Sequence, residues 1–84
     1  MDWNSECMLL KARSLVHVLN QTNVTQQASR ADFPKLLEQC DKKDAQSCLT
    51  AAEMVSAKEV MREISDDGSR VKIILDLLEK GSVL

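Results

Sequence analysis

The sequence predicts an all-α fold, a small antiparallel bundle of about four helices. Apolar residues recur at the three- and four-residue spacing of a helix face in four separate segments, and no segment shows the alternation of a strand. Aromatic residues make up only 2% of the 84-residue chain. The core must therefore consist of Leu, Val, Ile, Met and Ala side chains, which favour helices over sheets. A chain of this length is expected to form a single domain, residues 1–84.

The first helix is expected at about residues 5–20. Its buried stripe would be Met8, Ala12, Leu15 or Val16, and Leu19. Further apolar residues widen this stripe, so the helix should contact partners on two sides: Leu9, Leu10 and Val18. A polar loop without helical periodicity is predicted for residues 20–30. The two glycosylation sequons in this loop, which begin at Asn20 and Asn23, are interpreted as chance matches.

The second helix is predicted to begin at Asp32, which would act as its N-cap. Pro34 then falls in the first turn, where a missing N–H group costs nothing. The face that points to the core would consist of Leu36, Leu37 and Cys40. A charged, solvated connection over residues 41–47 is expected to follow this short helix.

The third helix is predicted at residues 50–64 because its start matches a capping box. In this motif the Thr50 hydroxyl accepts the N–H of Glu53, and the Glu53 side chain reaches back to the N–H of Thr50. Leu49 and Met54 occupy the positions of a hydrophobic staple. Its inward face would be Met54, Ala57, Val60 or Met61, and Ile64.

The fourth helix is predicted at residues 70–80, with Asp67 or Ser69 as its cap. The expected stripe is Val71, Ile74, Leu75 and Leu78. Asp76 and Lys80 have the spacing of an i, i+4 ion pair. Gly81 is expected to end the helix in the left-handed C′ conformation that glycine adopts readily.

Charge and composition argue against several classes of function. The net charge is −2, whereas a nucleic-acid binder usually carries a basic surface. No apolar run is long enough to cross a membrane. The N-terminus lacks the pattern of a signal peptide. We therefore expect a cytoplasmic protein that binds neither nucleic acid nor membranes, with its three cysteines as reduced thiols.

The sequence also gives little support for catalysis or metal binding. The chain has three thiols and one imidazole that could in principle hold zinc: Cys7, Cys40, Cys48 and His17. Zinc sites usually contain ligands close together in sequence, and no such pair occurs here. Cys7 and His17 would lie about 15 Å apart along the first helix, so they cannot form a dyad within it. We predict a protein that is not an enzyme and has no metal or cofactor.

The charged residues divide into two groups. The basic group lies on the first and fourth helices: Lys11, Arg13, Arg70 and Lys72. The acidic group runs from the end of the second helix through the third: Asp41, Asp44, Glu53, Glu59 and Glu63. If the first and fourth helices pack side by side, these groups form two complementary faces that could mate head to tail. The alternative is that both are simply solvated faces.

The order of these features resembles a caspase recruitment domain, a branch of the death-fold superfamily. The resemblance lies in four segments, one for each helix: CMLLKARSLVHVL, FPKLLEQC, CLTAAEMVSAKEVM and SRVKIILDLLEKGS. These segments cover most of the chain. The family pattern has six helices, and the fifth and sixth would follow the Lys80-Gly81 stop. The resemblance therefore predicts a death-fold-like bundle that ends after the fourth helix.

The resemblance implies a function in binding. Such domains act as adaptors in apoptotic and innate-immune signalling, and they associate with other, similar helical domains, often as homo-oligomers. One common contact sets a basic patch from helices one and four against an acidic patch from helices two and three. The charged groups named above fall in these patches. On this basis Arg70→Glu should abolish association and leave helicity intact.

An alternative function is a regulatory helical domain that docks a partner helix in an apolar groove. Val83, Leu84 and the methionines would line that groove. The two functions differ in their response to salt, because charge-based association weakens steeply as ionic strength rises.

Overall fold

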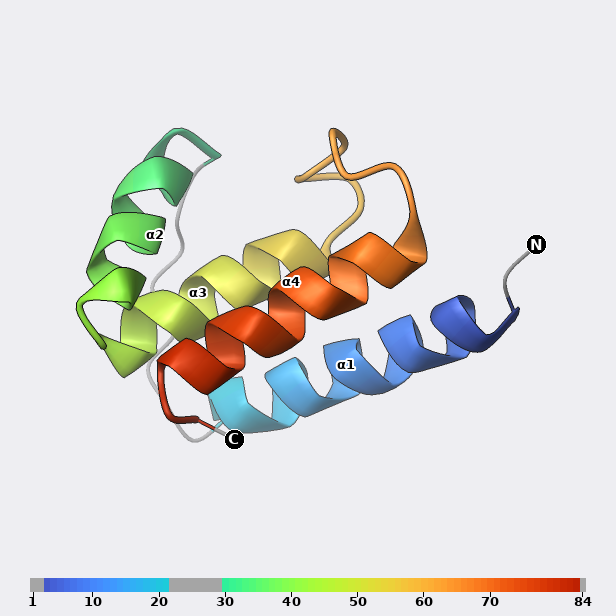
Figure 1. Ribbon diagram of the computed structural model, residues 1–84, viewed down its shortest axis with the longest axis horizontal. Helices are drawn as coiled ribbons and strands as arrows, with labels where there is room; N and C mark the ends of the chain where they lie inside the picture. Colours follow the sequence, from blue (N-terminus) through green and yellow to red (C-terminus); the bar gives the residue numbers. More distant parts are fainter. Residues whose placement is uncertain (1–2, 22–29, 84) are drawn as a thin grey trace.

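The computed structural model describes residues 3–21 and 30–83, and over these residues the chain is helical without strands (Figure 1). Its elements are α1 (Trp3–Gln21), the short 3₁₀ helix η1 (Arg30–Asp32), α2 (Phe33–Asp41), α3 (Ala45–Ser56) and α4 (Asp67–Lys80). The predicted all-α bundle is confirmed. Most of the predicted loop at 20–30, including the sequon at Asn23, lies outside the described residues, as does Leu84.

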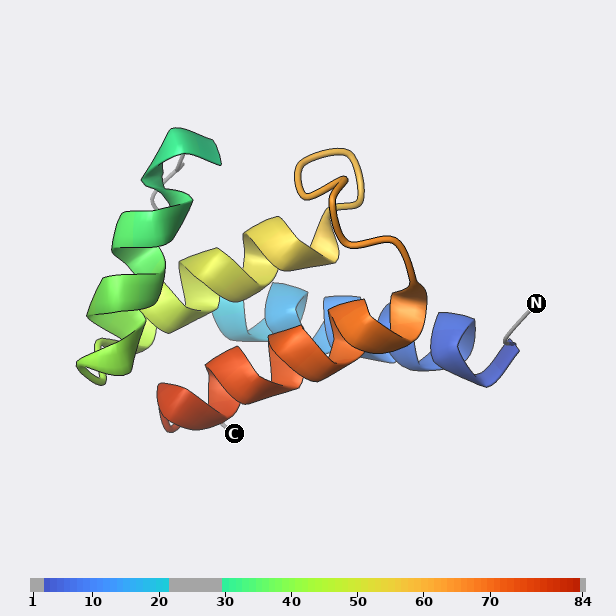
Figure 2. The same ribbon diagram turned by 45° about the horizontal axis from the view of Figure 1, so that its top comes forward.

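Three helices lie side by side and the remaining one crosses them at one end. Figures 1 and 2 show α3 running antiparallel to α1 and α4, which run in the same direction, while α2 stands steeply at the start of α3. The core lies between these helices: Leu9, Ala12, Val16, Cys40, Cys48, Leu49, Ala51, Ala52, Met54, Val55, Met61, Val71, Ile74, Leu77 and Leu78. No described helix is long and apolar enough to cross a membrane.

The buried face of α1 differs from the predicted stripe. Leu9, Ala12 and Val16 are buried, whereas the side chain of Met8, expected in the core, is 51% exposed. Leu10 and Val18, expected to widen the buried stripe, are 59% and 57% exposed. Adjacent residues on a helix point about 100° apart, so Leu9 and Leu10 cannot both face the same core.

A covalent bond closes the hairpin formed by α2 and α3. The turn passes through Lys43 in the left-handed region, with φ of 68°, and the Asp44 N–H donates to the Gln39 carbonyl. This turn sets Cys40 against Cys48, and the two form a disulfide, with both residues fully buried. The expectation of three reduced thiols is therefore wrong, and only Cys7, which is half-buried, keeps a free thiol.

The predicted start and end of the third helix are also wrong. α3 begins at Ala45, and Thr50 lies in its middle. The Thr50 hydroxyl donates to the Gln46 carbonyl at 2.8 Å instead of accepting a capping N–H, a common use of threonine within a helix. The helix ends at Ser56, because Ala57 is extended.

A buried arginine explains why the chain leaves the helix there. The Arg70 guanidinium donates to the backbone carbonyls of Val55, Met61 and Ile64. In a continuing helix, a backbone N–H would donate to the Val55 carbonyl, and here the guanidinium donates in its place. Its three hydrogen bonds hold the segment 57–66 in a non-helical path. Met61 is nevertheless buried in this segment, so its inward direction was predicted correctly.

The caps of α4 lie one residue away from the predicted ones. Asp66 is the N-cap, and its carboxylate accepts the Ser69 N–H at 2.8 Å. At the other end, the Val83 N–H donates to the Leu78 carbonyl and the Ser82 N–H to that of Glu79. This is the Schellman pattern with Ser82 as C′. Ser82 has φ of 54°, whereas Gly81 keeps a helical φ of −80°.

Gly81 is required for space and not for its backbone freedom. A Cβ at this position would lie 2.8 Å from the Cys48 Cβ and 3.1 Å from its Sγ. The disulfide hairpin thus packs directly against the end of α4. The absence of a side chain lets the two backbones approach.

We expect Gly81→Ala to destabilise the fold by about 1–3 kcal/mol, the usual cost of overpacking. Ser82→Gly is the matched control, and it should stabilise the fold by up to about 1 kcal/mol because it relieves a left-handed non-glycine residue. Urea unfolding of both variants measures the two changes. If Gly81→Ala unfolds at the wild-type midpoint, the close approach to Cys48 does not constrain the fold.

Candidate interaction surfaces

Arg70, expected in the exposed basic patch, is buried at 3% exposure. Its guanidinium is committed to the three carbonyls of the α3–α4 connection. This residue therefore leaves the set of candidate interaction residues. Sequence alone cannot distinguish such an arginine from an exposed one, because its carbonyl partners lie on a non-helical segment that periodicity does not predict.

Lys11 and Arg13 lie on opposite flanks of α1. Two residues on a helix differ in direction by about 200°, and each side chain lines a different depression. Lys11 lies on the side of α4, together with Val71 and Leu75. Arg13 lies on the side of α3, together with Glu53 and Ser56. The predicted single basic face is therefore divided in two.

An apolar groove of about 190 Å³ runs between α1 and α4. We call it the α1–α4 groove, and its lining residues are Met8, Lys11, Ala12, Leu15, Val71 and Leu75. Among the described residues of this lining, Lys11 is the one that carries a charge. Lys72, which is exposed, follows Val71 and precedes Leu75 by one turn of α4. Two of the four predicted basic residues thus lie in or beside a groove that the charge pattern did not reveal.

The predicted acidic residues do not form one patch. Asp41 and Asp44 lie at the α2–α3 turn, whereas Glu59 and Glu63 lie beyond the other end of α3. The twelve residues of α3 separate these pairs by about 18 Å. Glu53 lies between them, on the side of α3 that faces α1.

Two of these carboxylates form intramolecular ion pairs. Lys80 Nζ lies 2.9 Å from Asp41 Oδ1, and this hydrogen bond raises the pKa of Lys80 above its ordinary value. Glu63 pairs with Arg30. Asp76, the predicted i, i+4 partner of Lys80, contributes a smaller charge effect to the same pKa. Both pairs are exposed and add little to stability, but they reduce the acidic character of the surface.

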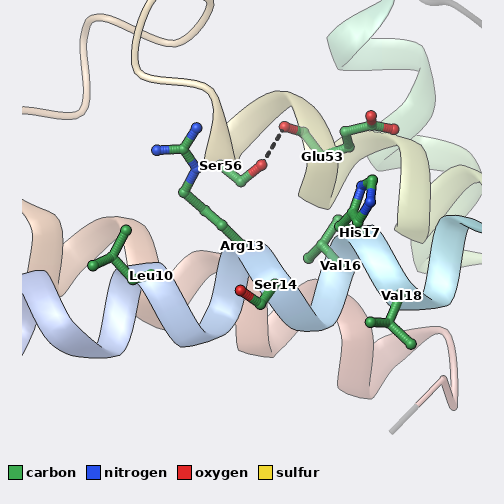
Figure 3. Close-up of a pocket in the computed structure, with 8 residues that line it drawn as sticks. All are labelled: Leu10, Arg13, Ser14, Val16, His17, Val18, Glu53 and Ser56. Carbon is green, nitrogen blue, oxygen red and sulfur yellow. Dashed lines mark hydrogen bonds between the residues drawn. The ribbon is translucent and has the colours of Figure 1, made fainter.

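A second, wider depression of about 710 Å³ lies between α1 and α3, and we call it the α1–α3 hollow. Its lining consists of Leu10, Arg13, Ser14, Val16, His17, Val18, Glu53 and Ser56. Figure 3 shows Arg13 and His17 on the side of α1 that faces α3, with Leu10, Ser14 and Val18 following one another along the helix. Ser56 donates to the Glu53 carbonyl at 2.7 Å and closes the end of α3.

The sequence contains a signal for the α1–α3 hollow that the helix stripe alone misses. Leu9 and Leu10 are adjacent, and Val16 and Val18 flank His17. Such clusters place apolar side chains on more than one side of a helix. Once Leu9 and Val16 are buried, Leu10 and Val18 must be exposed.

Neither depression contains a recognisable catalytic or metal-binding constellation. Within residues 3–21 and 30–83, no group of three His, Cys, Asp or Glu side chains could hold a metal ion. Two of the three cysteines are consumed by the disulfide. The arrangement offers apolar contact area with charged groups at its edges, which suits binding to another protein.

Comparisons with protein-family models, with curated proteins and with solved structures found no match for this chain. The resemblance to a caspase recruitment domain stays a prediction from the four sequence segments. The two depressions and their charges are the features of the molecule that bear on its function.

Proposed function

We propose that this chain is a protein–protein interaction domain of the adaptor or recruitment type, and that it binds its partner through the α1–α4 groove. The sequence resemblance points to apoptotic or innate-immune signalling as its setting. The role is binding, without catalysis or a cofactor. The partner is another protein, and a similar helical domain fits the resemblance.

The observation that carries this proposal is the exposure of apolar side chains beside two lysines. Met8 is 51% and Leu75 is 36% exposed, and both line the groove. Lys11 and Lys72 provide positive charge at its edge. In such an arrangement the apolar contacts supply affinity, while the charges steer an acidic partner and fix its orientation.

The same groove supports the alternative function, a regulatory domain that docks a partner helix. Of the residues expected to line that groove, Met8 does so, whereas Val83 packs against the core and Leu84 lies outside the described residues. The groove is lined mainly by apolar side chains, as helix docking requires. Association dominated by Lys11 and Lys72 weakens steeply with salt, whereas helix docking dominated by Met8 and Leu75 changes little.

The cytoplasmic location predicted from the sequence remains part of the proposal. The Cys40–Cys48 disulfide weighs against it, because structural disulfides are rare in reducing compartments. Both cysteines are fully buried, and burial limits access of reductants to the bond.

We expect Leu75→Asp and Lys72→Glu each to abolish or strongly weaken capture of protein partners from cell extract. Aspartate at position 75 removes apolar area at the groove, and glutamate at position 72 reverses the steering charge. Lys35→Glu is the matched control, because Lys35 is an exposed residue of α2. Immobilised wild-type and variant proteins are compared by quantitative mass spectrometry. Partners that both groove variants retain at the wild-type level would contradict the proposal.

A further inference from the structure

We infer that a second copy of this chain covers the α1–α3 hollow, and that the two copies form a two-fold dimer with their α1 helices antiparallel. This surface lies on the opposite flank of α1 from the α1–α4 groove. The inference therefore goes beyond the proposed function and does not depend on it. Three features of the hollow carry the argument: its apolar ridge, its small central residue and its pair of opposite charges (Figure 3).

The exposed face of α1 is symmetric about Ser14. Leu10 lies four residues before Ser14 and Val18 four residues after it, so each is about 6 Å from it along the axis. Their side chains are 59% and 57% exposed. A two-fold axis through Ser14 would place Leu10 of each copy beside Val18 of the other. The small Ser14 side chain lets the two helices approach closely at the axis.

The charges beside this ridge are complementary under the same symmetry. Arg13 and Glu53 both line the hollow, and Arg13 has no ion-pair partner among the described residues. Because the second α1 runs in the opposite direction, its Arg13 lies level with residue 15 of the first copy. Along the helix axis, that level is about 3 Å from His17, above which Glu53 projects from α3 (Figure 3). Two symmetric Arg13–Glu53 contacts would form across the axis.

The symmetry favours a second copy over an unrelated partner. An isologous dimer requires a patch that is complementary to itself, and this patch pairs an apolar residue with an apolar one and a cation with an anion. The acidic residues expected to bind the basic patch head to tail are dispersed over the surface. A closed dimer on the α1–α3 hollow needs only Glu53 from that group.

Sedimentation equilibrium of the full chain tests the dimer, because a charge swap gives a specific signature. The monomer mass is 9.4 kDa, and the wild-type mass should rise towards twice that value with concentration. Arg13→Glu or Glu53→Arg alone should weaken dimerisation at least tenfold. The double variant should restore it, because each ion pair then forms with its charges exchanged. Far-UV circular dichroism of each variant confirms that the helices persist.

Two further variants separate the dimer from other modes of association. Val18→Asp should leave a monomer, while Lys35→Glu on α2 should dimerise as the wild type does. A wild-type protein that stays at 9.4 kDa at millimolar concentration overturns the inference. It is also overturned if the double charge swap fails to recover the mass that either single change loses. Partner capture through the α1–α4 groove is unaffected by either result, so the two proposals fail separately.

Discussion

Replacing Arg70 by methionine is expected to lower the free energy of unfolding by about 3–5 kcal/mol. The guanidinium is 3% exposed and donates to the carbonyls of Val55, Met61 and Ile64. Methionine fills a similar volume but leaves these three acceptors without their donor. A buried acceptor left without its donor typically costs about 1–3 kcal/mol, so three such carbonyls account for a loss of this size. The loss is a large part of the total for a small domain, which is about 5–15 kcal/mol.

Urea unfolding followed by circular dichroism measures this change, and Arg62→Met provides the control. Arg62 lies in the same segment and is exposed, and within the described part of the chain it donates only to the Glu59 carbonyl. Its replacement should change stability by less than about 0.5 kcal/mol. A loss below about 1 kcal/mol for Arg70→Met would mean that water replaces the guanidinium at the three carbonyls.

The burial of Arg70 also changes the result expected for Arg70→Glu. From the sequence, this reversal should abolish association and leave helicity intact. In the folded structure, glutamate at position 70 would place a carboxylate against three carbonyl oxygens. We therefore expect loss of the folded state. A test of the basic surface must therefore use Lys11 or Lys72, which are exposed.

The four helices could be predicted because their apolar spacing is a local property of the chain. Leu36, Leu37 and Cys40 pack inward as expected, and so do Val71, Ile74 and Leu78. Leu75, predicted in the same stripe, is instead 36% exposed. The errors occur where a distant residue decides the local structure. Thr50 and Glu53 match a capping box, but the turn through Lys43 starts α3 at Ala45, and the hydrogen bond of Arg70 to Val55 lies at the other limit of α3.

The candidate surfaces were predicted less well, for a related reason. Charge along the sequence does not say which side of a helix a residue takes relative to its neighbours. Lys11 and Arg13 are close in sequence and lie on opposite flanks of α1. The groove and the hollow depend on which of several adjacent apolar residues the core accepts. Which of these residues becomes buried depends on how α3 and α4 pack together. The sequence of either segment alone does not predict it.

The second large effect is expected on removal of the Cys40–Cys48 disulfide. The bond closes a short loop, because the two cysteines have a sequence separation of 8. Chain entropy alone predicts a contribution of about 2.5 kcal/mol for a loop of this length. For a domain of this size, each kcal/mol corresponds to about 4–8 °C in Tm. The double variant Cys40→Ala/Cys48→Ala should therefore melt about 10–20 °C below the wild type.

Thermal unfolding with and without a reductant separates the bond from the loss of side-chain packing. Both proteins should carry Cys7→Ser, because the free thiol of Cys7 could form cross-links between chains. The reductant should lower the Tm of the protein that keeps the disulfide and leave the double alanine variant unchanged. Equal melting temperatures with and without reductant, after complete reduction is verified by mass, would show that the bond adds nothing to stability.

The rate of reduction tests how the hairpin is protected. Both sulfur-bearing residues are fully buried, and Gly81 at the end of α4 covers Cys48. A thiolate must reach a sulfur atom directly, so reduction of the native protein requires an opening that separates the hairpin from α4. Gly81→Ala strains this contact and should accelerate reduction well above the wild-type rate, while Ser82→Gly should not. Equal rates for all three proteins would mean that the hairpin opens independently of α4.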